Sequence, residues 1–415
     1  MTLLIKNIKE LVGILPVDIT RLCGAEMAQL STIKNSYLII ENGFIIDFGS
    51  MNQLSLNNAS HSLLTEIDAT GKMVFPSFCD SHTHLVYAGS REIEYVDKIK
   101  GLSYEEIAKR GGGILNSAKL LHETSENDLF NSAWQRLEEI KMLGTGAVEI
   151  KSGYGLTVED ELKMLRVIKR LKTQSSLMIR ATFLGAHAFP ALYKNDQNGY
   201  VELIINEMIP AIASEELADF IDVFCDRGFF TEYQTEQILM AGLKYGMRPK
   251  IHANELDYSG GIQVGVKYEA LSVDHLEFTG DEEINVLLNS ETMPTLLPGA
   301  AFFLGMPYAP VRKMIDAGLG VALASDFNPG SSPSGNMQFI LSMGCIKYKM
   351  LPEEAINATT INSAYAMGIG DETGSITKGK RANLFITTEV PSYQYMPYYF
   401  GHNKIETIIL NGKIQ

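Results

Sequence analysis

The sequence predicts a (β/α)₈ TIM-type barrel joined to a small β-sandwich that is built from both chain ends. Hairpin patterns stand near both ends of the 415-residue chain, and eight short apolar runs, separated mostly by helical patterns, fill its middle. Polar side chains gather where these runs end, which is where a barrel carries its active site. A barrel and one smaller domain together account for a chain of this length.

Composition and charge limit the possible partners. Hydrophobic residues make up 46% and charged residues 20% of the chain, a balance that supports a sizeable core and excludes intrinsic disorder. The formal net charge of −14 repels phosphate backbones, so we expect no nucleic-acid partner. The same charge repels an anionic substrate, and a site for one therefore needs a local cation.

The sequence also indicates a compartment. Its first residues lack the long apolar core and the small-residue cleavage site of a signal peptide. No run reaches the roughly 18 apolar residues of a membrane span. The cysteines are isolated and form no C-x-x-C pair; they are Cys23, Cys79, Cys225 and Cys345. We therefore expect a soluble, cytoplasmic protein that makes no membrane contact.

Both chain ends carry strand signals around an Asn-Gly pair, which tolerates the positive φ angles of a type I′ turn. Asn42-Gly43 lies within Tyr37–Asp47, and Asn411-Gly412 lies within Thr407–Ile414, after a further strand signal at Leu384–Thr388. Neither end has enough strands to cover itself, so we expect the two to combine. The predicted composite domain comprises residues 1–72 and 373–415, and the predicted barrel comprises residues 73–372.

The predicted barrel strands alternate with helical patterns. Asn127–Leu143 repeats apolar residues at helical spacing, with Ser125 as its expected N-terminal cap and Gly144 at its end. Val158–Leu171 carries an apolar stripe of the same period. The eight predicted strands are Val74–His84, Ala147–Lys151, Met178–Gly185, Phe220–Cys225, Lys250–Ala253, Leu271–His275, Met293–Leu297 and Val321–Ser325.

Five of the eight histidines stand at the ends of predicted strands: His82, His84, His187, His252 and His275. His82 and His84 are two apart on a strand, so both side chains project from one face. With His252 and Asp326 they form a set of three imidazoles and one carboxylate, which suits zinc or iron. The alternative of ordinary core histidines fits a lone histidine better than this set. We therefore predict one divalent metal ion, zinc or iron, at these strand ends.

Longer motifs around these residues resemble the amidohydrolase superfamily, whose first-strand signature is similar to Asp80-Ser-His-Thr-His84. Further stretches narrow the resemblance to its imidazolonepropionase family: Gly111-Gly-Gly-Ile114, Glu149-Ile-Lys-Ser-Gly-Tyr-Gly155, Phe183-Leu-Gly-Ala-His187, Lys250-Ile-His-Ala-Asn-Glu255 and Ala324-Ser-Asp-Phe-Asn-Pro-Gly-Ser-Ser332. The resemblance runs from about Val74 to the C-terminus. Ser77 and Asn254 depart from the expected glycine and aspartate.

The resemblance implies roles for individual residues. The metal ligands would be His82, His84, His252 and Asp326 in a mononuclear centre. Lys151 is left outside this set, although some relatives bridge two metals with a carboxylated barrel lysine. The residues facing the substrate would be Arg91, Tyr154, His187, Glu255, Asn328, Gly330 and Ser331. Two alternatives assign these residues no functional role. Arg91 could form a surface ion pair with Glu92 or Glu94, and residues 328–332 could be a tight turn.

The resemblance implies hydrolysis of the cyclic amide C–N bond of 4-imidazolone-5-propanoate to N-formimidoyl-L-glutamate, in histidine degradation. The residues alone predict only metal-assisted hydrolysis of a C–N bond in a small anionic substrate. Glu255, three residues past His252, is the expected general acid and base, and the other expected catalytic residues are His275 and Asp326. Arg91 would grip the substrate carboxylate. Whether Glu255 or His275 performs the main proton transfer stays open at this point.

Two alternative functions remain. The first is another amidohydrolase, such as a deaminase of a heterocyclic amidine, which would use the same metal and the same Glu255. The second is a non-catalytic barrel protein, against which the full ligand set argues. A homodimer is an expectation from the family alone.

Overall fold

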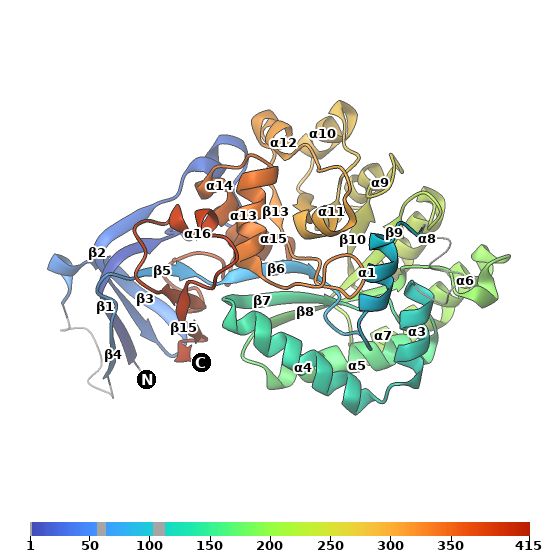
Figure 1. Cartoon of the computed structure of the whole chain (residues 1–415), viewed down its shortest axis with the longest axis horizontal. Helices are drawn as coiled ribbons and strands as arrows, with labels where there is room; N and C mark the ends of the chain where they lie inside the picture. Colours follow the sequence, from blue (N-terminus) through green and yellow to red (C-terminus); the bar gives the residue numbers. More distant parts are fainter. Residues whose placement is uncertain (1, 56–63, 103–112) are drawn as a thin grey trace.

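The computed structural model describes residues 2–55, 64–102 and 113–415. Two eight-stranded sheets organise these residues, and both chain ends belong to the same sheet. Figure 1 shows this terminal sheet on one side and the barrel with its helices on the other. The predicted fold class, a (β/α)₈ barrel with a smaller β domain from both ends, is thereby confirmed.

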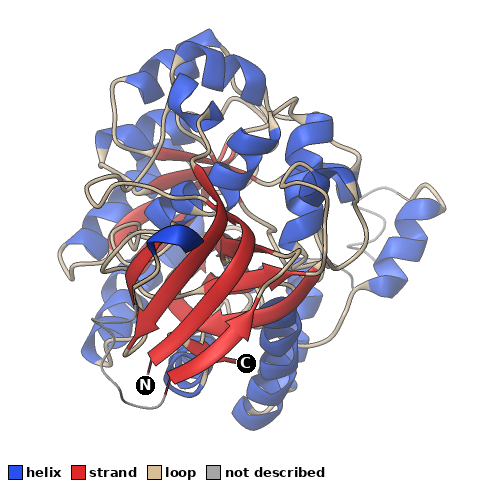
Figure 2. Ribbon diagram, turned by 90° about the vertical axis from the view of Figure 1, so that its left-hand side faces the viewer, coloured by secondary structure: helices blue, strands red, loops and turns tan. Residues whose placement is uncertain are grey.

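The terminal sheet joins five strands from the start of the chain to three from its end, in the order β16-β15-β14-β5-β1-β2-β3, with β4 paired to β1. β5 connects the two groups because it runs parallel to β1 and antiparallel to β14. Figure 2 shows these strands side by side, near both termini. Their bounds are β1 Thr2–Val12, β2 Thr32–Glu41, β3 Phe44–Ser50, β4 Leu64–Asp68, β5 Met73–Pro76, β14 Leu384–Thr387, β15 Ile405–Leu410 and β16 Lys413–Ile414.

Both predicted Asn-Gly turns are confirmed. Asn42 and Gly43 have φ angles of 51° and 90° between β2 and β3, and Asn411 and Gly412 have 50° and 71° between β15 and β16. The two turns also lie against each other, since a Cβ atom added to Gly43 would stand 3.0 Å from the carbonyl oxygen of Asn411. The two hairpins therefore pack turn against turn.

The first predicted barrel strand, Val74–His84, is wrong as a single strand. It divides at Ser77 into β5, which belongs to the terminal sheet, and β6, which opens the barrel. The backbone changes partners here: Ser77 N donates to Asn383 O at 2.9 Å, and Phe78 N donates to Gly144 O at 2.9 Å. The sequence does not reveal this change of partner, because the residues on both sides of Ser77 are buried. The domain boundaries at 72/73 and 372/373 stay predictions.

The barrel strands are hydrogen-bonded in sequence order, and every pair is parallel. The barrel closes between its first and last strands, where Asp326 N donates to His82 O and His84 N donates to Phe327 O, both at 3.0 Å. The bounds are β6 Phe78–Thr83, β7 Thr145–Lys151, β8 Met178–Ala186, β9 Phe220–Cys225, β10 Arg248–Ala253, β11 Ser272–His275, β12 Met293–Leu296 and β13 Ala322–Leu323.

Helices surround the barrel, and both helices predicted in detail are present. Ser125 caps α4 by accepting from Asp128 N, and Gly144, with φ of 96°, follows the end of the helix. No helix in the described part of the chain has the length and apolar character needed to span a bilayer. The helices are α1 Glu92–Ile99, α3 Ile114–Glu123, α4 Glu126–Met142, α5 Val158–Gln174, α6 Gln197–Leu203, α7 Ile209–Ser214, α8 Glu232–Leu243, α9 Gly261–Lys267, α10 Asp281–Leu288, α11 Pro298–Leu304, α12 Val311–Ala317, α13 Met337–Lys347, α14 Pro352–Thr359, α15 Ile361–Ala366 and α16 Tyr395–Tyr398.

Candidate metal centre and active site

Three histidines converge at the C-terminal ends of the barrel strands. His82 lies on β6, His84 directly follows that strand, and His252 lies on β10; one ligand nitrogen from each falls within 4.8 Å of the others. The Nε2 atoms of His84 and His252 are 3.4 Å apart. Asp326 Oδ1 lies 3.6 Å from the Nε2 atoms of both His82 and His84. All four side chains are buried.

Two buried aspartates orient the histidine rings. Asp274 Oδ2 lies 2.6 Å from His82 Nδ1, and Asp222 Oδ2 lies 3.0 Å from His252 Nδ1. A carboxylate on the far nitrogen fixes the tautomer and turns Nε2 toward a metal. His82 Nε2 has no hydrogen-bond partner among the described residues, which is costly for a buried nitrogen unless an ion takes it.

The electrostatics of these rings suit metal ligation. Burial lowers the pKa of His82 and His84 well below the usual value, and Lys151 and the neighbouring histidines lower it further. Neutral imidazole is the form that binds a metal. Burial raises the pKa of Asp326 to about 6, while the neighbouring His252 opposes this rise. The donor set therefore fits one divalent ion.

Glu255 and His275 flank this cluster. Glu255 follows β10 and is 12% exposed at its side chain; its Oε2 lies 3.7 Å from His275 Nε2. Burial raises the pKa of Glu255 to about 8, with smaller contributions from Asp326 and Asp226. His275 ends β11 with a φ of 83°, an unusual conformation for a histidine that turns the chain at the barrel mouth.

A second group of predicted residues lies beside the histidines. The Tyr154 ring is 5.8 Å from that of His84 and 5.4 Å from that of His187, and His187 stacks on His84 at 5.2 Å. Arg91 Cζ lies 5.7 Å from the centre of the Tyr154 ring. Arg91 Nε donates to Ser117 Oγ at 2.9 Å, whereas its buried Nη2 has no hydrogen-bond partner among the described residues.

The predicted loop 328–332 contacts this group through Gly330, whose absent Cβ would collide with Arg91 Nη1. The Asn328 side chain is occupied within the loop: its Oδ1 accepts from Gly330 N and Ser331 N at 2.7 and 2.8 Å, and its Nδ2 donates to Asp326 O at 2.7 Å. Ser331 Oγ lies 3.2 Å from Asp326 Oδ2. Asn328 therefore stabilises the loop that carries Gly330 and Ser331, two further residues predicted to face the substrate.

Several buried acidic residues at the site lack a role in the sequence-based prediction. They are Asp80, Glu161, Asp222, Asp274 and Glu277. Asp80 accepts from both the backbone and the hydroxyl of Ser325, joining the first and last strands. Glu161 on α5 accepts from the backbone of Gly153, Gly155 and Leu156, and so holds the loop that presents Tyr154. The sequence feature that could have indicated such a residue is a single carboxylate within an otherwise apolar strand, as at Asp222 in β9.

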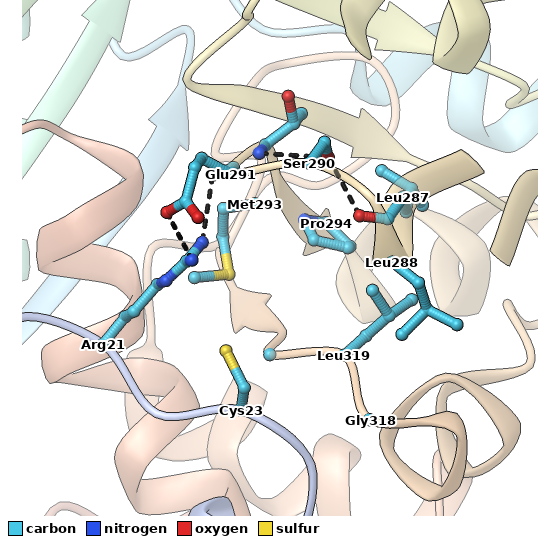
Figure 3. A pocket seen from close by; sticks show the side chains of 12 residues that line it. Arg21, Cys23, Leu287, Leu288, Ser290, Glu291, Met293, Pro294, Gly318 and Leu319 are labelled. Atoms are coloured by element: carbon cyan, nitrogen blue, oxygen red, sulfur yellow. Dashed lines mark hydrogen bonds and ion pairs between the residues drawn. The ribbon is translucent and has the colours of Figure 1, made fainter. Parts of the chain in front are cut away.

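Two motif residues, Gly111 and Gly112, lie outside the described residues. A surface pocket stands elsewhere, at the amino-terminal ends of β12 and β13, with Arg21 and Cys23 among its lining residues. Figure 3 shows Arg21 reaching across this pocket to Glu291. Because the histidines lie at the opposite ends of the strands, this pocket is separate from the candidate site.

Comparisons with known proteins assign the family. A profile of the amidohydrolase family matches residues 246–414. The chain is 57% identical to a protein of Flavobacterium johnsoniae and 55% identical to one of Christiangramia forsetii, over all of each chain; both are named imidazolonepropionase. A third protein of that name, from Thermoanaerobacter pseudethanolicus, is 42% identical over 98% of this chain and 96% of its own.

Solved structures agree on the fold. A zinc complex of an atrazine chlorohydrolase mutant from Arthrobacter aurescens has a TM-score of 0.71 at 14% identity, covering 99% of this chain and 94% of its own. A zinc-bound adenosine deaminase from Xanthomonas campestris has 0.69 at 14% identity, with coverages of 99% and 92%. Sequence identity this low bears on the fold alone, whereas the full-length relatives decide the family. The chain belongs to the imidazolonepropionase family of the amidohydrolases.

Proposed function

We propose that this protein binds one divalent ion, zinc or iron, and hydrolyses the cyclic amide C–N bond of 4-imidazolone-5-propanoate to give N-formimidoyl-L-glutamate. The relatives' shared name supports the substrate. One observation supports the chemistry most strongly: three buried histidines, two of them oriented by aspartates, lie near an arginine whose Nη2 has no hydrogen-bond partner within the described part of the chain.

The proposed ligands are His82, His84, His252 and Asp326. When bound there, the ion supplies Lewis-acid activation of a water molecule and of the substrate carbonyl. Glu255 stands close enough to take the water proton and pass it to the ring nitrogen as the C–N bond breaks. A nearby cation would lower the pKa of Glu255 from about 8 toward neutrality, which leaves it ionised for the first step and protonated for the second.

Two further residues complete the proposed chemistry. His275, whose Nε2 lies 3.7 Å from Glu255 Oε2, would donate to the oxygen that gains charge as water adds. Arg91 would bind the propionate carboxylate through Nη2, which lacks a hydrogen-bond partner among the residues the structure describes, and Tyr154 and His187 would cover the substrate ring. Arg91 would thus supply the local cation that an anionic substrate needs in a protein with a net charge of −14.

The test is direct turnover. Purified protein loaded with zinc or iron should remove the ultraviolet absorbance of the imidazolone ring, and the product should match N-formimidoyl-L-glutamate by mass and by chromatography. Release of ammonia without ring opening would indicate a deaminase instead. A metal content well below one ion per chain, with no turnover, would favour a non-catalytic barrel protein. The cytoplasmic location and the homodimer stay predictions, to be tested by cell fractionation and by sedimentation.

A further inference from the structure

A buried lysine stands beneath the histidine cluster. Lys151, on β7, is fully buried, and its Nζ lies 2.7 Å from Glu149 Oε1 and 2.8 Å from Asp222 Oδ2. Asp274 Oδ2 lies 3.6 Å from the same nitrogen. One ammonium group therefore meets three carboxylates that come from three different barrel strands.

The oxygens that meet Lys151 also meet the metal-binding histidines. Asp222 Oδ2 contacts His252 Nδ1, and Asp274 Oδ2 contacts His82 Nδ1. The ammonium is thus one contact removed from two of the three imidazoles. Each aspartate has one further hydrogen bond, from His252 N to Asp222 Oδ1 at 3.1 Å and from Ser272 Oγ to Asp274 Oδ1 at 2.5 Å, so Lys151 fixes the Oδ2 atoms that face the two rings.

The surroundings of Lys151 keep its side chain in the protonated form. Burial alone would lower the pKa of Lys151, but Asp222 and Glu149 outweigh burial and raise it, so the group stays an ammonium. Glu149 is held in turn by Thr182 Oγ1 at 2.6 Å and by the ammonium of Lys250. Carboxylation of the amine would need a free base and would place a fourth negative group among the three carboxylates.

We propose that Lys151 is a positioning residue whose ammonium ties Asp222 to Asp274 and orients His252 and His82 through them. This inference rests on the proposed metal site and adds the residue that holds the two ring-orienting carboxylates in place.

The main experiment measures metal binding rather than turnover, so that it stays separate from the test of the proposed function. Metal-free wild type, Lys151→Met and Lys250→Met are titrated with Co²⁺ by visible absorbance. Lys250 is the comparison variant because it is equally buried and contacts Glu149, whereas its Nζ hydrogen-bonds to neither aspartate and acts on Asp274 through its charge alone. We expect Lys151→Met to weaken Co²⁺ binding about 10- to 100-fold and Lys250→Met to weaken it clearly less.

A second measurement follows the rings themselves. Wild type with Co²⁺ replaced by Zn²⁺ should show downfield proton resonances from the Nδ1–H groups of His82 and His252, and Lys151→Met should lose both. Equal Co²⁺ affinities in wild type and Lys151→Met, or equal losses in the two lysine variants, would overturn the proposal.

The wild type alone keeps the proposal testable if Lys151→Met does not fold. Protein equilibrated with ¹³C-bicarbonate should show no carbamate carbon resonance. A carbamate signal would overturn the proposal, because a carbamate cannot supply the cation that ties Asp222 to Asp274.

Discussion

Glu255 illustrates how burial prepares a side chain for proton transfer. Its backbone N–H donates to Asp226 Oδ2 at 2.8 Å, which anchors the residue just after β10, while its carboxylate reaches His275. Withdrawal from water and the neighbouring negative charges raise the pKa of Glu255 to about 8. A group whose pKa lies near the working pH both accepts and returns a proton at low cost.

Replacing Glu255 by glutamine should lower kcat by roughly 10²- to 10⁴-fold, since the amide cannot take the proton. Metal content, measured by atomic emission, should stay near wild type because Glu255 is not a proposed ligand. Asp257→Asn is the matched control: it changes a carboxylate two residues away, which pairs with the exposed Arg227, and should leave kcat intact. An unchanged kcat in the metal-replete Glu255→Gln protein would transfer the role to His275 or Asp326.

Arg91→Ala should lose roughly thirty- to several-thousand-fold in kcat/KM, because a desolvated carboxylate without its partner costs about 2–5 kcal/mol. Lysine at the same position should recover only part of this loss, since its single ammonium cannot grip both oxygens. Steady-state kinetics on an imidazolone without the carboxylate provide the comparison. Equal impairment of Arg91→Ala on that analogue would make Arg91 structural.

Among single residues, the sequence indicates the candidate metal ligands more clearly than the buried residues that orient them. The spacing of His82 and His84 on one strand carries its own meaning, because alternate residues share a face. Asp222, Asp274 and Lys151 gain meaning only when strands β7, β9 and β11 are set in register, and no local pattern specifies that register. The oxygens of Asp222 meet His252 from the neighbouring strand, and those of Asp274 meet His82 from a strand that is not its neighbour, at separations of 30 and 192 residues in the sequence.

Elements were predictable where local chemistry decides them. The Asn-Gly turns need positive φ angles, and the cap of α4 needs a hydroxyl before its first turn, so both are visible in the sequence. The division at Ser77 is not, because it depends on partners at Asn383 and Gly144 that are distant in sequence. Hydrophobic periodicity reports burial, and β5 and β6 are both buried.

The start of α5 gives a prediction on pH. Asp160 lies in its first turn, with Lys163 Nζ 2.9 Å from Oδ1 and His122 Nδ1 2.8 Å from Oδ2. Burial raises the pKa of Asp160, but the contacts with Lys163 and His122 outweigh burial and lower it. A folded-state pKa below the unfolded value stabilises the protein above the unfolded pKa, and this contribution is lost as the pH falls through the folded value.

Asp160→Asn should therefore lower the free energy of unfolding by about 1 kcal/mol near pH 7, and the difference from wild type should shrink as the pH falls below about 4. Urea unfolding across this pH range measures it. Glu159→Gln, at the exposed neighbouring position, should show a much smaller difference. A difference that grows on acidification would mean that the contacts of Asp160 do not favour its ionised form.

For the whole molecule, the candidate metal centre is built on a barrel that is already packed. The proposed ligands come from the C-terminal end of β6, from β10 and from the segment after β13, and the hydrophobic core around them extends through the barrel and its helices. We therefore expect that the fold does not depend on the ion as a zinc finger does.

Chelation should abolish turnover while the far-UV circular dichroism spectrum stays close to that of the loaded protein. The melting temperature should fall, because an ion that binds only the folded state stabilises it. Readdition of zinc or iron should restore both turnover and melting temperature. A collapse of the circular dichroism signal together with activity would make the ion structural.

The pairing of β5 with β14 has a consequence for synthesis on the ribosome. β5 is complete at Pro76, but its antiparallel neighbour begins at Leu384, so about 300 residues must be translated before that edge is filled. At bacterial elongation rates this takes roughly 15 to 60 s. During this interval the nascent chain carries an open strand edge, which is a site for pairing with another chain. The last strands to emerge thus seal the edge left by the first, and truncation before β14 should yield a barrel prone to aggregation.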